Sequence, residues 1–156
     1  MPAETITPER IVAEARNWLG VPWRHQGRSR QGVDCVGLIV AVARDLGLDP
    51  VDWTAYRRHA ADREIVTRFR VQLHEIPLAE AQPGDVLLFR EQAYPCHAAI
   101  LSARRGVPHI IHAHASRRRV VEEPYAADWP ARATHAFQMT GIRHPIISPQ
   151  TVSPGS

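Results

Sequence analysis

Lysine is absent from this sequence, and all 19 of its basic residues are arginines. These arginines are scattered along the chain, and the formal net charge is only +3. A nucleic-acid-binding protein usually has a denser basic stripe together with a recognisable motif. We therefore expect no nucleic-acid partner, although the charge is compatible with a mild attraction to an anionic polymer such as cell wall.

Long apolar segments are also absent. No run approaches the roughly 20 apolar residues that a membrane-spanning helix needs, so we expect no membrane span. Residues 1–5 lack the basic region and following apolar stretch of a signal peptide. We therefore expect the protein to be cytoplasmic at synthesis. It would reach a cell wall only by lysis or as part of a larger particle such as a virion.

Cysteine is scarce, since the chain has only Cys35 and Cys96. A chain of 156 residues can bury a core of its own and does not need a disulfide, so thiol reactivity is the more informative question. We expect one domain over residues 1–144. The Pro/Ser/Thr-rich segment 145–156 is predicted to be a disordered tail.

Apolar spacing and turn residues predict helices first and strands after. Thr7 as N-cap and Pro8 at the first helical position begin the first helix, which Gly20 ends. Residues 22–33 are predicted to form a loop, and residues 49–61 to be irregular. The predicted helices cover residues 7–19, 34–46 and 62–74, and the predicted strands residues 86–89, 97–101, 109–114, 119–122 and 134–139. This order favours an α+β fold, with N-terminal helices packed on a C-terminal antiparallel β-sheet.

Cys35 stands at the start of the second predicted helix, which is apolar almost all round. The N–H groups and dipole of a helix N-terminus lower the pKa of a thiol, and they can also stabilise an oxyanion. A free cysteine at such a position is also often a small core residue. Cys35 is therefore a candidate nucleophile that needs a base from elsewhere in the chain.

Histidines on two neighbouring predicted strands can supply that base. His97 begins one strand, while His112 and His114 lie on the next with the same strand parity. One histidine can accept the thiol proton while another orients its ring. The spacing does not choose between His112 and His114 as the orienting residue.

A zinc site built from Cys96, His97, His112 and His114 is the rival interpretation of these residues. Adjacent residues on a strand point to opposite faces, so Cys96 and His97 do not easily converge on one ion. No CxxC or HExxH spacing occurs either. We therefore expect no metal, and we interpret Cys96 as a spare thiol.

Several short segments together carry a resemblance. They are Gly-Val-Pro-Trp-Arg-His-Gln-Gly at 20–27, Gly-Val-Asp-Cys-Val-Gly-Leu at 32–38, Pro-Gly-Asp at 83–85, His-Ala-Ala-Ile at 97–100 and Ile-His-Ala at 111–113. In this order and spacing the chain resembles the NlpC/P60 superfamily of papain-like cell-wall cysteine peptidases over about residues 6–140. The His-Gln-Gly motif at 25–27 and the lack of a signal-peptide pattern look most like its phage and prophage branch, whose members are associated with tail assembly.

The resemblance implies a papain-like fold with Cys35 as nucleophile, His97 as base and His112 as orienting residue. It implies no cofactor. The implied substrate is the peptide stem of peptidoglycan, cut between D-γ-glutamate and a diamino acid. Other phage tail proteins are the implied partners.

One position departs from the family pattern. Twelve residues before the cysteine the family commonly has a tyrosine that assists the oxyanion site, whereas this chain has Trp23. An indole N–H can donate a hydrogen bond but cannot accept one. Residues predicted to line the substrate or oxyanion site are Trp23, His25, Asp34 and His114. A structural tail component with an idle hydrolase fold is the alternative function, and an acyltransferase is a weaker one because the cysteine precedes the histidine.

Overall fold

The computed structural model describes residues 5–52, 64–91 and 95–139. Its helices are α1 (Pro8–Arg16), α2 (Cys35–Asp45), α3 (Glu64–Gln72), the 3-10 turn η1 (Leu78–Glu80) and α4 (Trp129–Arg132). Its strands are β1 (Arg28–Ser29), β2 (Gly32–Val33), β3 (His74–Ile76), β4 (Val86–Arg90), β5 (Pro95–Arg104), β6 (Val107–His114), β7 (Arg119–Pro124) and β8 (Ala133–Gln138). The α+β prediction is confirmed. The predicted tail, residues 145–156, and most of the predicted irregular segment lie outside the described residues.

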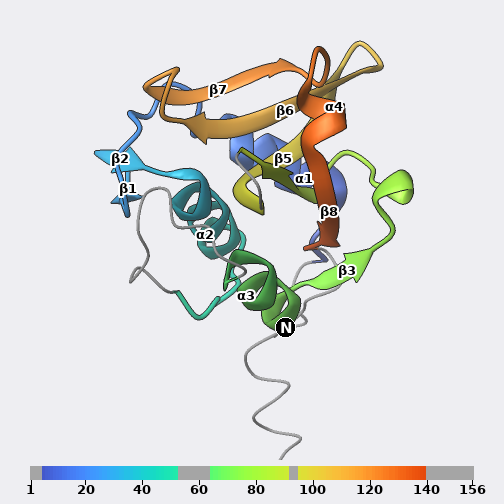
Figure 1. Cartoon of the computed structure of the whole chain (residues 1–156). Coiled ribbons are helices and arrows are strands. Elements are labelled where there is room, and N and C mark those ends of the chain that lie inside the picture. The colour runs from blue at the N-terminus through green and yellow to red at the C-terminus, as the bar shows by residue number, and fades with distance from the viewer. Residues whose placement is uncertain (1–4, 53–63, 92–94, 140–156) are drawn as a thin grey trace, which may run out of the picture.

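The main sheet has six strands in the order β3-β8-β4-β5-β6-β7, and all of its pairs are antiparallel. The last strand of the described chain, β8, therefore lies between β3 and β4 rather than at an edge (Figure 1). Sequence patterns predicted the five longest strands but missed β3, the small β1–β2 sheet and α4. These elements are only two to four residues long, too short to show a period.

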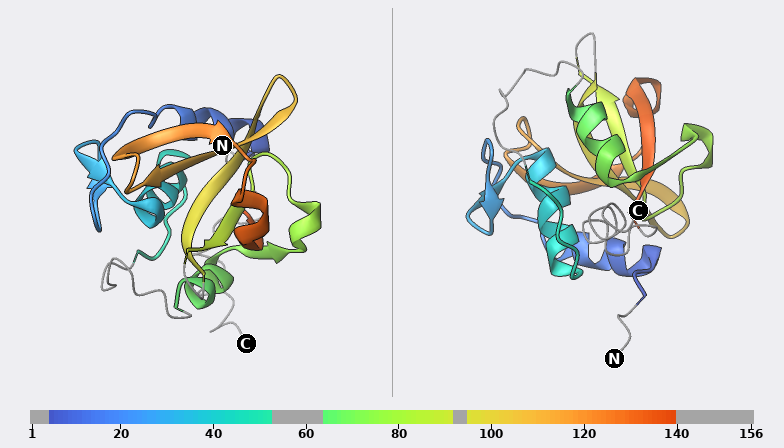
Figure 2. Two further views of the ribbon diagram at one scale, coloured as in Figure 1. Left: turned by 45° about the horizontal axis from the view of Figure 1, so that its top comes forward. Right: turned by 90° about the horizontal axis from the view of Figure 1, so that it is seen from below.

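Two core clusters cover the two faces of this sheet. Helices α1, α2 and α3 pack on one face, which presents the alternate β5 residues Ala98 and Ile100. The other face presents Ala99 and Leu101 of the same strand, and η1 and the region of Trp129 cover it. Figure 2 shows this arrangement from two further directions. Helix α2 is buried almost all round, as its apolar composition predicted. Among the described residues, no helix is long and apolar enough to cross a membrane.

Helix α1 begins as predicted, with the Thr7 side chain accepting a hydrogen bond from the Arg10 N–H at 3.2 Å. Ile11, Ala15 and Trp18 are buried. Leu19, near the end of the predicted helix 7–19, is 37% exposed. The helix ends at Arg16, so the turn that follows rotates Leu19 away from the core.

An ionic cluster fastens α1 to the sheet. Arg16 donates to both carboxylate oxygens of Glu122, at 3.1 and 2.9 Å. Arg104 and the buried Ser102 hydroxyl donate to the same carboxylate. Burial raises the pKa of Glu122, but these donors together outweigh it and leave the pKa below its usual value. The cluster joins α1 to β5 and β7, and so places the chain segment that leads to residue 23.

The Pro-Gly-Asp turn at 83–85 starts β4. Gly84 has φ +101°, and a side chain there would press on the backbone of Pro8 at the start of α1. Its N–H donates to the Leu101 carbonyl at 2.8 Å. Glycine is required here because the left-handed conformation coincides with a close approach to the first helix.

Candidate active site

Asp34 is the N-cap of α2 and organises the segment in front of it. Its carboxylate accepts hydrogen bonds from the N–H groups of Gly37 at 2.8 Å and Gln26 at 2.7 Å. Arg28 reaches the same carboxylate at 3.1 Å. Asp34 was predicted to line the substrate or oxyanion site. The structure instead buries it under the loop, where it fixes the helix start on which Cys35 stands.

Gly37 explains why a glycine follows the cysteine at this spacing. A Cβ atom at Gly37 would lie far inside contact distance of the Gly27 carbonyl oxygen and 2.9 Å from Nη1 of Arg28. The loop before α2 therefore lies directly on the first turn of the helix, at a distance that only glycine allows.

Cys35 is half-buried at the first position of α2, and its sulfur accepts a hydrogen bond from the backbone N–H of Ala98. Ala98 is the residue after His97. Among the described residues, β5 and β6 pair from Ile100–Ile111 to Arg104–Val107, and this pairing does not reach Ala98. The thiol therefore lies beside β5 where that strand has separated from β6, next to the backbone that carries His97.

His97 and His112 are joined directly. Nε2 of His97 lies 2.7 Å from Nδ1 of His112, and both side chains are buried. Continuing the β5–β6 register would place His97 opposite His114, so the separation of the two strands determines which histidine it meets. The structure brings His97 to His112, a choice that sequence spacing left open.

His114 makes a different set of contacts. Its Nε2 lies 3.1 Å from the Glu91 carboxylate, and its Nδ1 lies 2.6 Å from the Ser116 hydroxyl. Its ring is in edge contact with that of His97, with the centroids 5.1 Å apart. His114 therefore borders the histidine pair without a hydrogen bond to it.

Burial controls the ionisation of the three central groups. It lowers the pKa of His97 well below the usual range, with nearby His112 and His114 acting in the same direction. It also lowers the pKa of His112 to about 4, although the Glu123 carboxylate opposes the decrease. The sequence predicted a lowered pKa for the Cys35 thiol. That prediction is wrong, because burial raises the pKa, the adjacent Asp34 carboxylate raises it further, and the Ala98 N–H offsets only part of the increase.

Trp129, at the start of α4, contributes to that burial and was missed by the sequence analysis. Its ring is in contact with the rings of His97, His112 and His114, at centroid distances of 5.8, 5.1 and 5.6 Å. Asp128 before it and Pro130 after it are helix-start residues, the only signal in the sequence that a short helix begins here.

Trp23 and His25 lie in the segment before α2, and their rings stack with centroids 6.5 Å apart. The backbone N–H of Trp23 donates to the Arg118 carbonyl at 2.9 Å, so the β6–β7 hairpin holds this segment. Trp23 is half-buried and packs against the same core cluster as Cys35. Both residues therefore lie on the side of the molecule where α2 begins.

The rival zinc site finds no support in the described part of the chain, where no group of three or more His, Cys, Asp or Glu residues is arranged to hold a metal ion. The facing nitrogens of His97 and His112 are hydrogen-bonded to each other. Neither Cys35 nor Cys96 is part of a disulfide. Cys96 precedes His97 on β5, and the side chains of adjacent strand residues point to opposite faces.

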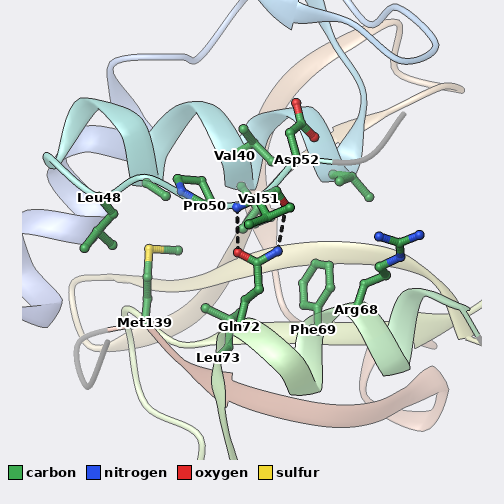
Figure 3. Close-up of a pocket in the computed structure, with 13 residues that line it drawn as sticks. Val40, Leu48, Pro50, Val51, Asp52, Arg68, Phe69, Gln72, Leu73 and Met139 are labelled. Carbon is green, nitrogen blue, oxygen red and sulfur yellow. Dashed lines mark hydrogen bonds between the residues drawn. The ribbon is translucent and has the colours of Figure 1, made fainter. Parts of the chain in front are cut away.

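An apolar pocket lies apart from these groups, between α2 and α3 (Figure 3). Val40, Phe69, Leu73 and Met139 are among its lining residues. The Gln72 side chain closes one side of it through hydrogen bonds to both the N–H and the carbonyl of Val51. Neither Cys35 nor the histidines line this pocket.

Comparisons with solved structures find the same fold. The NlpC/p60 domain of the peptidoglycan hydrolase SagA is 25% identical, with a TM-score of 0.60, and the match covers 86% of this chain and 100% of that domain. An NlpC/P60 family protein from Bacillus cereus is 17% identical with a TM-score of 0.63, and a lipoprotein-like NLP/P60 protein from Staphylococcus aureus is 23% identical with a TM-score of 0.59. The matches cover 86% and 88% of this chain but only 40% and 44% of those two chains.

A comparison with curated protein sequences gave no match. The profile of the NlpC/P60 family, by contrast, matches residues 20–138. That range includes the N-cap and first turn of α2, the Pro-Gly-Asp turn and all three histidines of the cluster. It covers more than half of the chain, and this chain therefore belongs to the NlpC/P60 family.

Proposed function

We propose that this protein is a cysteine peptidase that cleaves the peptide stem of peptidoglycan at the D-γ-glutamyl–diamino acid bond. The direct His97–His112 hydrogen bond beside the Cys35 helix start carries the proposal. The structural likeness to the domain of a peptidoglycan hydrolase supports the choice of substrate class.

In the proposed reaction His97 is the general base. Its Nε2 is engaged by His112, so Nδ1 remains to take the proton from the Cys35 thiol as the sulfur attacks the amide carbon. His97 then returns that proton to the leaving amine, which gives a thioester on Cys35. Water activated by His97 hydrolyses the thioester and restores the thiol.

Because burial favours the neutral forms of both the thiol and the imidazole, proton transfer accompanies the attack instead of preceding it. The developing oxyanion needs hydrogen-bond donors. The first N–H groups of a helix have no partner within the helix, and Asp34 takes that of Gly37. The proposed donors for the oxyanion are the backbone N–H of Cys35 and the indole N–H of Trp23.

Digestion of purified peptidoglycan tests this proposal. The expected products, identified by mass, are fragments in which the stem peptide ends at D-glutamate, with a matching new amino terminus on the diamino acid. Peptidoglycan made with L-lysine and with diaminopimelate as the diamino acid should both be tried. Intact stem peptides after prolonged incubation with both would contradict the proposal.

A second candidate function is a tail-assembly component in which the hydrolase fold is idle. The raised pKa of the Cys35 thiol is the observation that favours it. Alkylation by iodoacetamide at pH 7 separates the two candidates, with Cys96 as an internal comparison. For a peptidase we expect Cys35 to react faster than Cys96, and the His97→Ala variant to lose that difference. A Cys35 that reacts no faster than Cys96, with or without His97, supports the idle component.

A further inference from the structure

A carboxylate stands behind the histidine pair. Oε2 of Glu123, on β7, lies 2.6 Å from Nε2 of His112. The other oxygen of Glu123 lies 3.0 Å from Nη2 of Arg117. The Glu123 side chain is mostly buried and His112 is fully buried. Hydrogen bonds thus run in one line from Arg117 through Glu123 and His112 to His97, the residue before Ala98, whose N–H donates to the Cys35 sulfur.

Glu123 determines which group donates and which accepts in each of these hydrogen bonds. Burial raises the pKa of Glu123, but its bonds to His112 and Arg117 outweigh that and leave the carboxyl group ionised. An ionised carboxylate only accepts hydrogen bonds, so Nε2 of His112 must carry a proton. Since neutral His112 has one ring proton, its Nδ1 must accept, and Nε2 of His97 must donate.

This donor–acceptor order determines whether Nδ1 of His97 carries a proton. Two neutral imidazoles can share a hydrogen bond in either direction, and only one direction leaves Nδ1 of His97 unprotonated. In the opposite direction Nδ1 would carry the proton and could not act as a base. The distance of 2.7 Å between the rings does not distinguish the two directions.

The same carboxylate also faces the charge that develops during the reaction. When His97 takes the thiol proton it becomes a cation, and His112, His114 and Arg132 are the groups of its own charge type that act on it. Glu123, two hydrogen bonds away, and Glu91, which reaches the site through His114, supply the opposing charge. Glu123 is connected to His97 by hydrogen bonds that run through His112. Glu91 is hydrogen-bonded to His114, which has no hydrogen bond to the His97–His112 pair.

We propose that Glu123 is a positioning residue of the active site, which fixes the protonated nitrogens of His112 and His97 so that Nδ1 of His97 is free to act as the base. Arg117 holds Glu123 in place. The catalytic consequence rests on the proposed peptidase function, whereas the proton positions can be measured without any activity.

The first test measures the ring protons by nitrogen-15 NMR of the full-length protein at neutral pH. We expect both His97 and His112 to carry their proton on Nε2. In Glu123→Gln the side-chain amide can either donate to or accept from His112, so both histidines should show a mixture of tautomers. Glu75→Gln is the control, because Glu75 is also paired with an arginine, Arg70, at 2.8 Å. Unchanged tautomers in Glu123→Gln would overturn the proposal even if the protein is an active peptidase.

The second test is kinetic. For Glu123→Gln we expect kcat for stem-peptide cleavage to fall about 10- to 100-fold while KM changes by less than about twofold. Loss of the carboxylate should also shift the acid limb of the kcat/KM profile to lower pH. The groups that still face the pair, His114, Glu91 and Arg132, are unchanged in this variant. A loss of equal size at every pH, without a shift of the acid limb, would indicate a purely structural role and contradict the proposal.

Discussion

Replacing Cys35 with alanine is expected to reduce hydrolysis of purified peptidoglycan by at least about 10³-fold, because the acyl-enzyme route is lost together with the sulfur. The fold should persist. Cys35 is half-buried at the first position of α2, and removal of its sulfur leaves the N-cap hydrogen bonds of Asp34 in place. We expect the free energy of unfolding to change by about 1 kcal/mol or less. Fragment release by mass spectrometry and thermal unfolding by circular dichroism measure the two effects.

Cys96→Ala is the matched control for this experiment. Cys96 is also half-buried and outside any disulfide, but by strand parity its side chain points to the opposite face of β5 from the His97 ring. This variant should retain most of the activity. Comparable fragment release by Cys35→Ala and the wild type would show that the thiol of Cys35 is not the nucleophile.

Replacing Gly37 with alanine is expected to destabilise the protein by about 3 kcal/mol, although alanine is the better helix former. In an unobstructed helix the substitution would stabilise by roughly 1 kcal/mol. Here the new methyl group would overlap the backbone oxygen of Gly27, and a backbone atom cannot move aside as a flexible side chain can. The melting temperature should fall by roughly 6–12 °C. Activity should fall by about 100-fold as the start of α2 moves.

Gly47→Ala provides the comparison. Gly47, just after α2, has φ +88° and open space around its Cβ position, so a methyl group there costs about 1–2 kcal/mol of conformational strain and meets no neighbour. Gly47→Ala should therefore be the milder variant and keep its activity. A Gly37→Ala variant that is as stable as the wild type would mean that the loop before α2 does not press on the helix.

Local patterns were sufficient for the long elements. Thr7 and Pro8 marked the start of α1, Asp34 the start of α2, and the Pro-Gly-Asp turn the start of β4, because caps and turns depend on neighbouring residues only. The order of strands was beyond such patterns. Strand β8 enters between β3 and β4, a pairing between residues about 60 positions apart that no local signal encodes.

The active-site candidates divide in the same way. Residue type, helix position and the family motifs singled out Cys35, His97 and His112 from the sequence alone. The choice of His112 over His114 depended on where β5 and β6 separate. Trp129 and Glu123 were not singled out, because each reaches the histidines from an element whose place is known only in the folded chain.

The sequence by itself determined the fold class, the family and the thiol at the start of the second helix. The tertiary structure decided the chemical state of that thiol. A helix N-terminus in water would lower its pKa, but packing against β5 removes solvent from the sulfur and places it beside Asp34, so its pKa rises. Desolvation depends on every element that surrounds the group, and only the folded chain brings those elements together.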